Sequence, residues 1–210
     1  MSFDDRVLIA GAGPVGLVAA ANLVRRGVPV TVFEAGPELS QESRASTFHP
    51  PTLDMLAELG AADALLAQGL IAPRFQYRTK REGVLAQFDF GVIADATRHP
   101  YRVQCEQFRL TRILYDQLRS RPGFSIAFDE PVVNVRQSEM GVEIAVGRQG
   151  SMVRRTGRWL IGADGARSAV RQSLEIEFEG FTWPERFLVV STPVRFLQGH
   201  SRSRSGELRG

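Results

Sequence analysis

Three glycines near the N-terminus have the spacing that the binding of a nucleotide phosphate requires. Gly11, Gly13 and Gly16 form G-x-G-x-x-G within residues 7–36, VLIAGAGPVGLVAAANLVRRGVPVTVFEAG. The first glycine allows a tight turn after a strand, the second lets the backbone approach a pyrophosphate, and the third lets a helix pack closely on the sheet. The helix that follows would offer free N–H groups to the phosphates. The predicted cofactor-binding residues of this loop are Gly11, Ala12, Gly13, Pro14, Val15 and Gly16.

A carboxylate follows the glycine loop at the distance typical of dinucleotide-binding proteins. Glu34 ends the second predicted strand, 18 residues after Gly16, where it can bind the hydroxyls of a ribose. Glu34→Gln should therefore weaken cofactor binding modestly and leave the thermal stability of the free protein near that of the wild type. FAD and NAD both contain a pyrophosphate and an adenosine ribose, so these residues leave both cofactors open.

A second stretch, WLIGADGARSAVR at residues 159–171, could also bind a nucleotide. A predicted strand ends at Asp164-Gly165, and a helix with Arg167 near its start follows at once. Asp164 could accept hydrogen bonds from a ribose or from backbone N–H groups. Gly165 would permit close approach, and Arg167 could pair with a phosphate or a carboxylate.

Together the two motifs resemble those of the group A FAD-dependent aromatic monooxygenases, the flavoprotein hydroxylases. The family has the N-terminal glycine motif with its strand-terminal glutamate, and a D-G-x-x-S-x-x-R motif. This chain matches the second motif with Asp164, Gly165, Ser168 and Arg171. The resemblance covers about residues 6–195 and implies FAD as cofactor, NAD(P)H as reductant and a phenolic or other small aromatic substrate. It also implies that Asp164 serves both FAD and NAD(P)H.

Two intermediate segments support the resemblance. In SRASTFHPPTLDMLAELG, the family pattern of an arginine before a helix implies that Arg44 lies at the flavin side of the cofactor. In EQFRLTRIL, Gln107 matches a family glutamine that opens a helix near FAD, and Gln104 is a rival for that role. Two other hypotheses stay open: an NAD(P)-dependent dehydrogenase and a non-catalytic nucleotide-binding remnant.

The elements that must position these residues alternate between strand and helix. This alternation predicts the α/β class, with a Rossmann-type βαβ FAD-binding domain and a partial, β-rich substrate domain. The expected strands are Arg6–Ala10, Val30–Phe33, three within Phe124–Ala145, Trp159–Ala163 and Phe187–Val194, with a hairpin over Phe75–Ile93. The expected helices are Val15–Arg26, two within Glu38–Gly69, Cys105–Leu118 and Ser168–Leu174.

The predicted domains follow from these elements. Residues 1–180 would form the FAD-binding domain, with 73–100 as an excursion into the substrate domain. Residues 181–197 would begin that substrate domain, and the Arg/Ser-rich 198–210 would be a disordered tail. The Gly-Asp segment that the family carries further along does not occur in the sequence. We therefore expect an incomplete family member that is not a competent hydroxylase by itself.

Composition argues against several other classes. Cys105 is the only cysteine, which rules out an internal disulfide and a cysteine metal cluster, and the three histidines lack metal-ligand spacing. The net charge is +3 without a basic cluster, so no nucleic-acid partner is expected. No uncharged apolar run is long enough for a membrane span, and the N-terminus has no signal-peptide pattern. The sequence therefore predicts a cytoplasmic protein without a metal or membrane partner.

Overall fold

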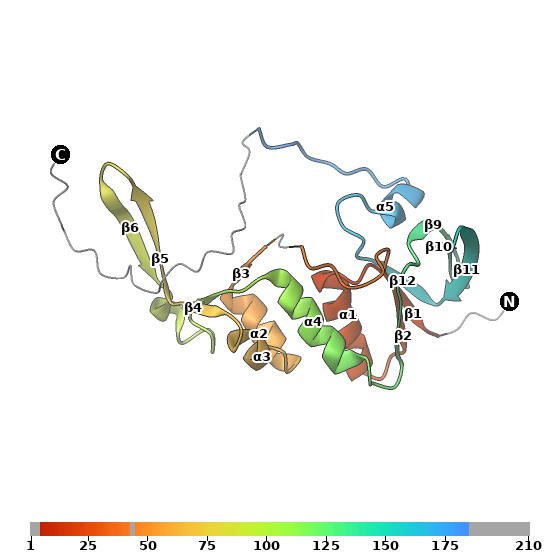
Figure 1. The fold of residues 1–210 in the computed structure, drawn as a ribbon, viewed down its shortest axis with the longest axis horizontal. Helices are drawn as coiled ribbons and strands as arrows, with labels where there is room; N and C mark the ends of the chain where they lie inside the picture. Colours follow the sequence, from red (N-terminus) through yellow and green to blue (C-terminus); the bar gives the residue numbers. More distant parts are fainter. Residues whose placement is uncertain (1–4, 43–44, 185–210) are drawn as a thin grey trace. The chain divides into compact units, whose positions relative to one another are not determined.

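The computed structural model describes residues 5–42 and 45–184 (Figure 1). The chain divides into two units, residues 1–177 and 178–210. All the helices and strands of the described residues lie in the first unit, and residues 178–184 of the second contain neither. The strand predicted at Phe187–Val194 and the predicted tail 198–210 fall outside the described residues.

A four-stranded parallel sheet forms the centre of the first unit. Its order is β12-β1-β2-β8, with β1 at Val7–Ala10, β2 at Val30–Phe33, β8 at Phe124–Ala127 and β12 at Trp159–Gly162. All three pairings are parallel, and Val7 of β1 is opposite Val30 on one side and Trp159 on the other. These short apolar strands are the ones that the sequence predicts. The predicted α/β class is therefore confirmed.

Strand β1 is buried on both faces, because successive side chains enter different cores. Val7 and Ile9 pack with the helices, whereas Leu8 and Ala10 pack against a second, three-stranded sheet. Figure 1 shows this layering, with α1 and α4 on one side of β1 and β2 and with β9, β10 and β11 on the other. A continuous apolar run is what a strand covered on both sides requires.

The helical layer begins directly after the glycine loop. Helix α1 spans Pro14–Arg25, with a proline in its first turn where the missing N–H costs nothing. Gly27, at φ +78°, follows the end of the helix, where a left-handed conformation favours glycine. Helix α4, Gln107–Leu118, packs beside α1 and buries Leu110, Ile113 and Leu114 in the shared core.

The region 38–69 differs from the sequence-based expectation. Residues 38–42 and 45–46 are not helical, and strand β3, Thr47–Phe48, follows them. The second predicted helix is divided at Gly60 into α2, Pro50–Glu58, and α3, Ala62–Leu66. Strand β3 exists because β7, Arg102–Gln104, supplies its backbone partners, with Thr47 opposite Gln104.

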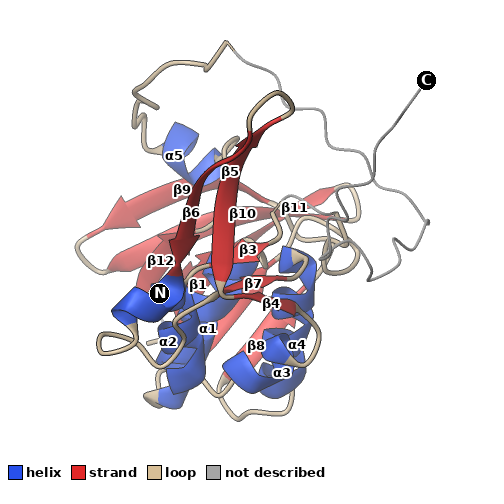
Figure 2. Ribbon diagram, turned by 90° about the vertical axis from the view of Figure 1, so that its left-hand side faces the viewer, coloured by secondary structure: helices blue, strands red, loops and turns tan. Residues whose placement is uncertain are grey.

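The remaining strands form small antiparallel sheets. Strand β4, Leu70–Ala72, completes the sheet β3-β7-β4. The predicted hairpin consists of β5, Arg74–Thr79, and β6, Gly83–Asp89, followed by the 3-10 helix η1, Phe90–Ile93 (Figure 2). The three-stranded sheet contains β9, Val132–Ser138, β10, Gly141–Arg148, and β11, Ser151–Gly157, and α5, Ala169–Ser173, packs on it. Strand β11 has no counterpart in the sequence-based prediction.

Candidate cofactor cleft

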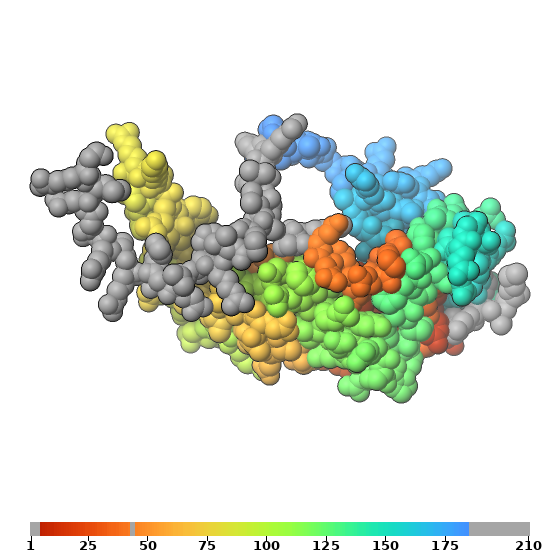
Figure 3. Space-filling view, viewed as in Figure 1, coloured from red at the N-terminus to blue at the C-terminus, as the bar shows by residue number. Residues whose placement is uncertain are grey.

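A cleft of about 480 Å³ lies at the carboxyl ends of the parallel strands. Ligands of open α/β sheets bind at this edge, and the volume is within the usual range for small-molecule sites. Except for Gly16, the described cofactor-site residues predicted from the sequence line this one cleft: Gly11, Ala12, Gly13, Pro14, Val15, Glu34, Gln107 and Asp164. Gly16 does not line it and packs against the carbonyl of Gly11. In Figure 3 the orange segment that follows β2 lies against the green segment that follows β8.

The three glycines of the loop are required for different reasons. Gly11 has φ +97°, and a Cβ there would lie 2.5 Å from the carbonyl oxygen of Ala163. A Cβ on Gly16 would collide with the carbonyl oxygen of Gly11. At Gly13 a Cβ would meet no protein atom within 4 Å. Gly11 and Gly16 are therefore required by the fold itself, whereas the open space at Gly13 fits a ligand phosphate that approaches the backbone.

Glu34 is fixed by the backbone on both carboxylate oxygens. Oε2 accepts a hydrogen bond of 2.7 Å from the N–H of Ala12, and Oε1 accepts one of 3.0 Å from the N–H of Gly36. Each carboxylate oxygen has a second lone pair that can accept a hydrogen bond from a ribose hydroxyl. The side chain thus has a structural role that the spacing argument did not include, and its geometry remains compatible with ribose binding.

Asp164 holds the turn between β12 and α5. Its Oδ2 accepts a hydrogen bond of 3.1 Å from the N–H of Val170. Its Oδ1 is buried and accepts no hydrogen bond from the described residues. A buried polar atom without a partner is uncommon and costly, so Oδ1 fits a hydroxyl or N–H donor of a bound cofactor. Gly165, at φ +80°, makes the turn, and Ser168 caps α5 by accepting from the N–H of Arg171.

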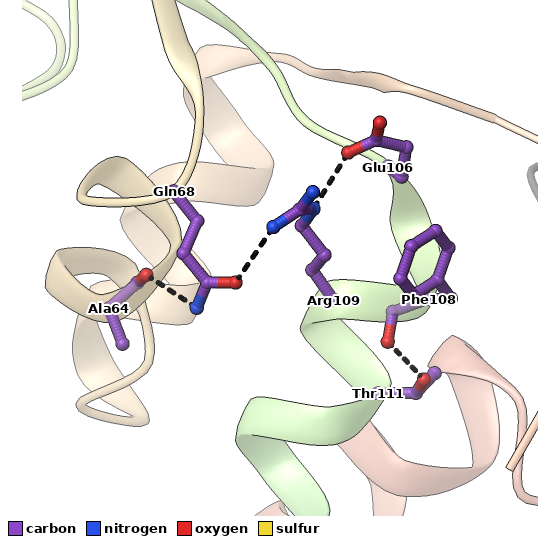
Figure 4. A network of polar contacts seen from close by, with 6 residues as sticks. All are labelled: Ala64, Gln68, Glu106, Phe108, Arg109 and Thr111. Atoms are coloured by element: carbon purple, nitrogen blue, oxygen red, sulfur yellow. Dashed lines mark hydrogen bonds and ion pairs between the residues drawn. The ribbon is translucent and has the colours of Figure 1, made fainter. Parts of the chain in front are cut away.

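Gln107 begins helix α4, and a polar network fixes that end of the helix (Figure 4). Arg109 donates from Nε to Glu106 over 2.7 Å and from Nη1 to Gln68 over 3.5 Å. Gln68 in turn donates to the carbonyl of Ala64 in α3. The pKa of Glu106 is lowered from its ordinary value, because its own backbone N–H and Arg109 both donate to the carboxylate. The network ties α4 to α3 and thereby sets where Gln107 meets the cleft.

Two predictions have a different status. Arg44 lies outside the described residues, so its place at the flavin side stays a prediction. Gln104, the rival of Gln107, is in β7 and accepts a hydrogen bond of 2.9 Å from Thr47, away from the residues of the cleft. Among the two glutamines, the cleft therefore favours Gln107.

Several lining residues carry no sequence signal for a nucleotide. They come from the segment after β2, from α4, from the loop before β9 and from the first residue of β9, namely Ser40, Glu42, Phe108, Thr111, Pro131 and Val132. Their side chains reach the cleft only because β8 pairs with β2 and α4 packs on α1. Arg167, which the sequence suggested as a phosphate partner, also lines the cleft.

A second polar cluster lies outside the cleft. His99 is only 8% exposed, and its Nδ1 is 2.6 Å from Asp54 Oδ1. Thr97 donates to the other oxygen of Asp54 over 2.6 Å. Hydrogen bonds from Thr97 and then from His99 lower the pKa of Asp54. The cluster fastens the segment before β7 to helix α2. Within residues 5–42 and 45–184, no three histidine, cysteine or acidic side chains are grouped as metal ligands would be.

Comparison with known proteins agrees with this geometry. Residues 4–201 match the sequence model of the family described as FAD binding domain. The para-nitrophenol 4-monooxygenase of Pseudomonas sp. strain WBC-3 is 34% identical over 95% of this chain, and the 6-hydroxy-3-succinoylpyridine 3-monooxygenase of Pseudomonas putida is 36% identical over 93%. This chain spans about half the length of each, 50% in both cases.

A solved structure gives the same relationship. The crystal structure of p-nitrophenol 4-monooxygenase from Pseudomonas putida DLL-E4 superposes with a TM-score of 0.81 at 30% identity, over 86% of this chain and 46% of that protein. In the part of the chain that the structure describes, no helix has the length and apolar character needed to cross a membrane. Since the family match covers nearly the whole chain, the resemblance to FAD-dependent aromatic monooxygenases is confirmed, and the chain belongs to the FAD binding domain family.

Proposed function

We propose that this chain acts in an NAD(P)H-dependent monooxygenase that adds a hydroxyl group to a phenolic or related aromatic ring. The observation that carries the proposal is the single cleft where the glycine loop, Glu34, Gln107 and Asp164 meet. Both relatives are named for substrates with a hydroxylated aromatic ring, a phenol in one case and a pyridine in the other. A hydroxyl group activates such a ring toward electrophilic oxygen, so we infer the same substrate class here.

The residues of the cleft would divide the cofactor among them. Gly13 and the N–H groups at the start of α1 would bind the pyrophosphate. Glu34 would accept hydrogen bonds from the adenosine ribose, and the buried Oδ1 of Asp164 would accept one from FAD, with NAD(P)H as a further partner of that side chain. Gln107 and Arg44 would contact the flavin side.

Bound FAD supplies the redox chemistry, which is hydride acceptance from NAD(P)H and activation of O₂. The protein's own contribution is to bind, orient and shield. The match covers about half the length of each of the two monooxygenase relatives, so the other half of those proteins, which could shield a bound flavin, has no counterpart in this chain. Because excluding water protects reactive intermediates, we expect hydroxylation by these 210 residues alone to be poorly coupled to NAD(P)H oxidation. Of the two alternatives, the family match does not support an NAD(P)-dependent dehydrogenase, and no feature of the cleft favours a non-catalytic remnant.

The test combines a binding assay with a turnover assay. FAD is titrated into the purified chain, and quenching of flavin fluorescence reports binding. NADH or NADPH is then added with and without p-nitrophenol or a hydroxypyridine, and reductant loss, peroxide and hydroxylated product are measured. Bound FAD with NAD(P)H oxidation that an aromatic compound accelerates supports the proposal. Absence of FAD binding contradicts it, and hydroxylated product that forms in step with reductant loss contradicts the expected poor coupling of the chain alone.

A further inference from the structure

A buried carboxylate next to the cofactor cleft belongs to none of the motifs above. Glu130 is 6% exposed and lies in the loop between β8 and β9. Its Oε1 is 3.3 Å from Nε of Arg148 in β10, and its Oε2 is 3.4 Å from Nη2 of Arg155 in β11. We call Glu130, Arg148 and Arg155 the Glu130 clamp.

The loop that carries Glu130 is hydrogen-bonded to the end of β2. The N–H of Glu130 donates to the carbonyl of Glu34 over 3.0 Å, and the N–H of Asp129 donates to the carbonyl of Gly36 over 3.0 Å. Gly36 is also the residue whose N–H donates to the Glu34 carboxylate. The backbone on both sides of that carboxylate is therefore fixed by Asp129 and Glu130.

The same loop is strained and anchored on its other side. Asp129 has φ +55°, a conformation that few residues other than glycine adopt and that the surrounding contacts must hold in place. Pro131, which lines the cleft, accepts a hydrogen bond of 3.0 Å from the N–H of Gly147 in β10. The three-stranded sheet thus determines the position of the loop, and the loop determines the position of Glu34.

The clamp arginines supply the counter-charges of the buried Glu130 carboxylate. A buried carboxylate without a counter-charge is strongly unfavourable, so removing one partner of a buried pair disturbs its surroundings well beyond the lost contact. Arg155 is about one-third exposed, at 34%, and Arg148 is more exposed, at 55%, so Arg155 is the more enclosed partner of Glu130.

We propose that the Glu130 clamp positions Glu34 and Gly36 to receive the adenosine ribose of the bound dinucleotide. The inference rests on the proposed function, because it assumes that the cleft binds FAD in the orientation given above. Glu130 and its arginines would be positioning residues, since they act through the backbone of the Glu34 turn and not by touching the cofactor.

The experiment compares neighbouring arginines of the same strand. Arg155→Gln removes one clamp partner. Arg154→Gln is the matched control, because Arg154 is 69% exposed and pairs instead with Glu143, at 3.5 Å on β10. Arg155→Lys keeps the charge. Dissociation constants are measured for FAD and for ADP, which contains the pyrophosphate and the adenosine ribose without the flavin, and thermal unfolding is recorded for each protein.

The expected result is a rise of about fivefold or more in the dissociation constants of both FAD and ADP for Arg155→Gln. Arg154→Gln should leave both constants unchanged, and Arg155→Lys should restore most of the affinity. In a Glu34→Gln background the further effect of Arg155→Gln should fall below about twofold, because coupled residues do not act additively.

A clamp that only stabilises the fold would give another pattern. Arg155→Gln would then lower the unfolding temperature and leave both dissociation constants unchanged, or its effect would add fully to that of Glu34→Gln; either result overturns the proposal. If the wild-type chain binds ADP and not FAD, the proposed function fails while the ADP measurements still decide on the clamp. If it binds neither, both proposals fail.

Discussion

Strand β1 of the parallel sheet and the β5–β6 hairpin differ in how far their apolar side chains are buried. All four residues of β1 are buried, and the strand separates two cores. In the hairpin, Tyr77 is 62% exposed and Phe88 is 47% exposed, although Phe88 stacks on Phe75 and Tyr77 meets Phe75 edge-to-face. The hairpin also carries the Arg74–Asp89 ion pair and a hydrogen bond between Gln76 and Gln87.

This difference in burial shows which part of the chain supports the cofactor cleft. The cleft is built on strands that cannot shift without disturbing both cores, which is the rigid support that a cofactor site needs. Among the described residues the two hairpin strands pair only with each other, and Arg102 packs on them with its guanidinium 4.6 Å from the centre of the Phe75 ring. A two-stranded hairpin alone is of marginal stability. Variants in the two regions should therefore behave very differently.

The largest effect is expected at Gly16. Gly16→Ala places a methyl group on the carbonyl oxygen of Gly11, so the start of α1 must move away from the sheet. We expect a loss of about 3 kcal/mol or more in the free energy of unfolding, the upper range for overpacking. Urea unfolding followed by circular dichroism measures it.

Gly13→Asp should have the opposite effect to Gly16→Ala, because it should weaken cofactor binding and leave stability intact. Gly13 is the N-cap of α1 in extended conformation, where aspartate is a favoured residue, so stability should not fall. A carboxylate in the phosphate position should nevertheless weaken FAD binding by on the order of 10²-fold. If Gly13→Asp binds FAD normally, or if Gly16→Ala is as stable as the wild type, the division between fold glycines and the ligand glycine is wrong.

An intermediate effect is expected at Glu34. Glu34→Gln replaces one acceptor oxygen by an NH₂ group that faces a backbone N–H, either of Ala12 or of Gly36. We expect a loss of about 1–3 kcal/mol in stability without cofactor, together with weaker FAD binding. This revises the sequence-based expectation that stability would stay near wild type. The exposed Glu38 supplies the control: Glu38→Gln should change neither quantity.

The smallest effect is expected in the hairpin. Phe88→Ser removes a half-exposed ring from a face that contributes to neither core, so the free energy of unfolding should change by less than about 1 kcal/mol. Ile9→Ala in β1, where the side chain is 0% exposed, should cost about 2–5 kcal/mol. Similar losses for the two variants would mean that the hairpin is part of the folded core.

The sequence predicted the central sheet well, because strands buried on both faces appear as short apolar runs such as Val7–Ala10 and Val30–Phe33. The prediction was wrong at residues 38–42 and 45–46, which are not helical. There the backbone partners lie far along the chain: the carbonyl of Ser46 accepts from the N–H of Cys105, and that of Ala45 accepts from the N–H of Gln107. Local helix propensity could not reveal these partners.

The residues of the cleft likewise include some that sequence motifs predict and others that only the tertiary structure brings there. The sequence identified the glycine loop, Glu34 and Asp164 as candidate cleft residues, because each belongs to a motif whose residue types and spacing reflect nucleotide binding. Pro131 and Val132 reach the cleft through strand pairing, and Glu130 is notable only for its burial beside two arginines. None of these properties can be read from neighbouring residues in the sequence.

The unequal glycines also bear on how such a chain would change over generations. Substitution at Gly11 or Gly16 breaks the fold whether or not a cofactor is used, whereas Gly13 is constrained only by the ligand. In a lineage that stopped binding its dinucleotide, Gly11 and Gly16 would therefore be retained, whereas Gly13 could be substituted by other residues. In a descendant of this chain, the middle glycine of G-x-G-x-x-G is thus the position that would record the loss of the cofactor.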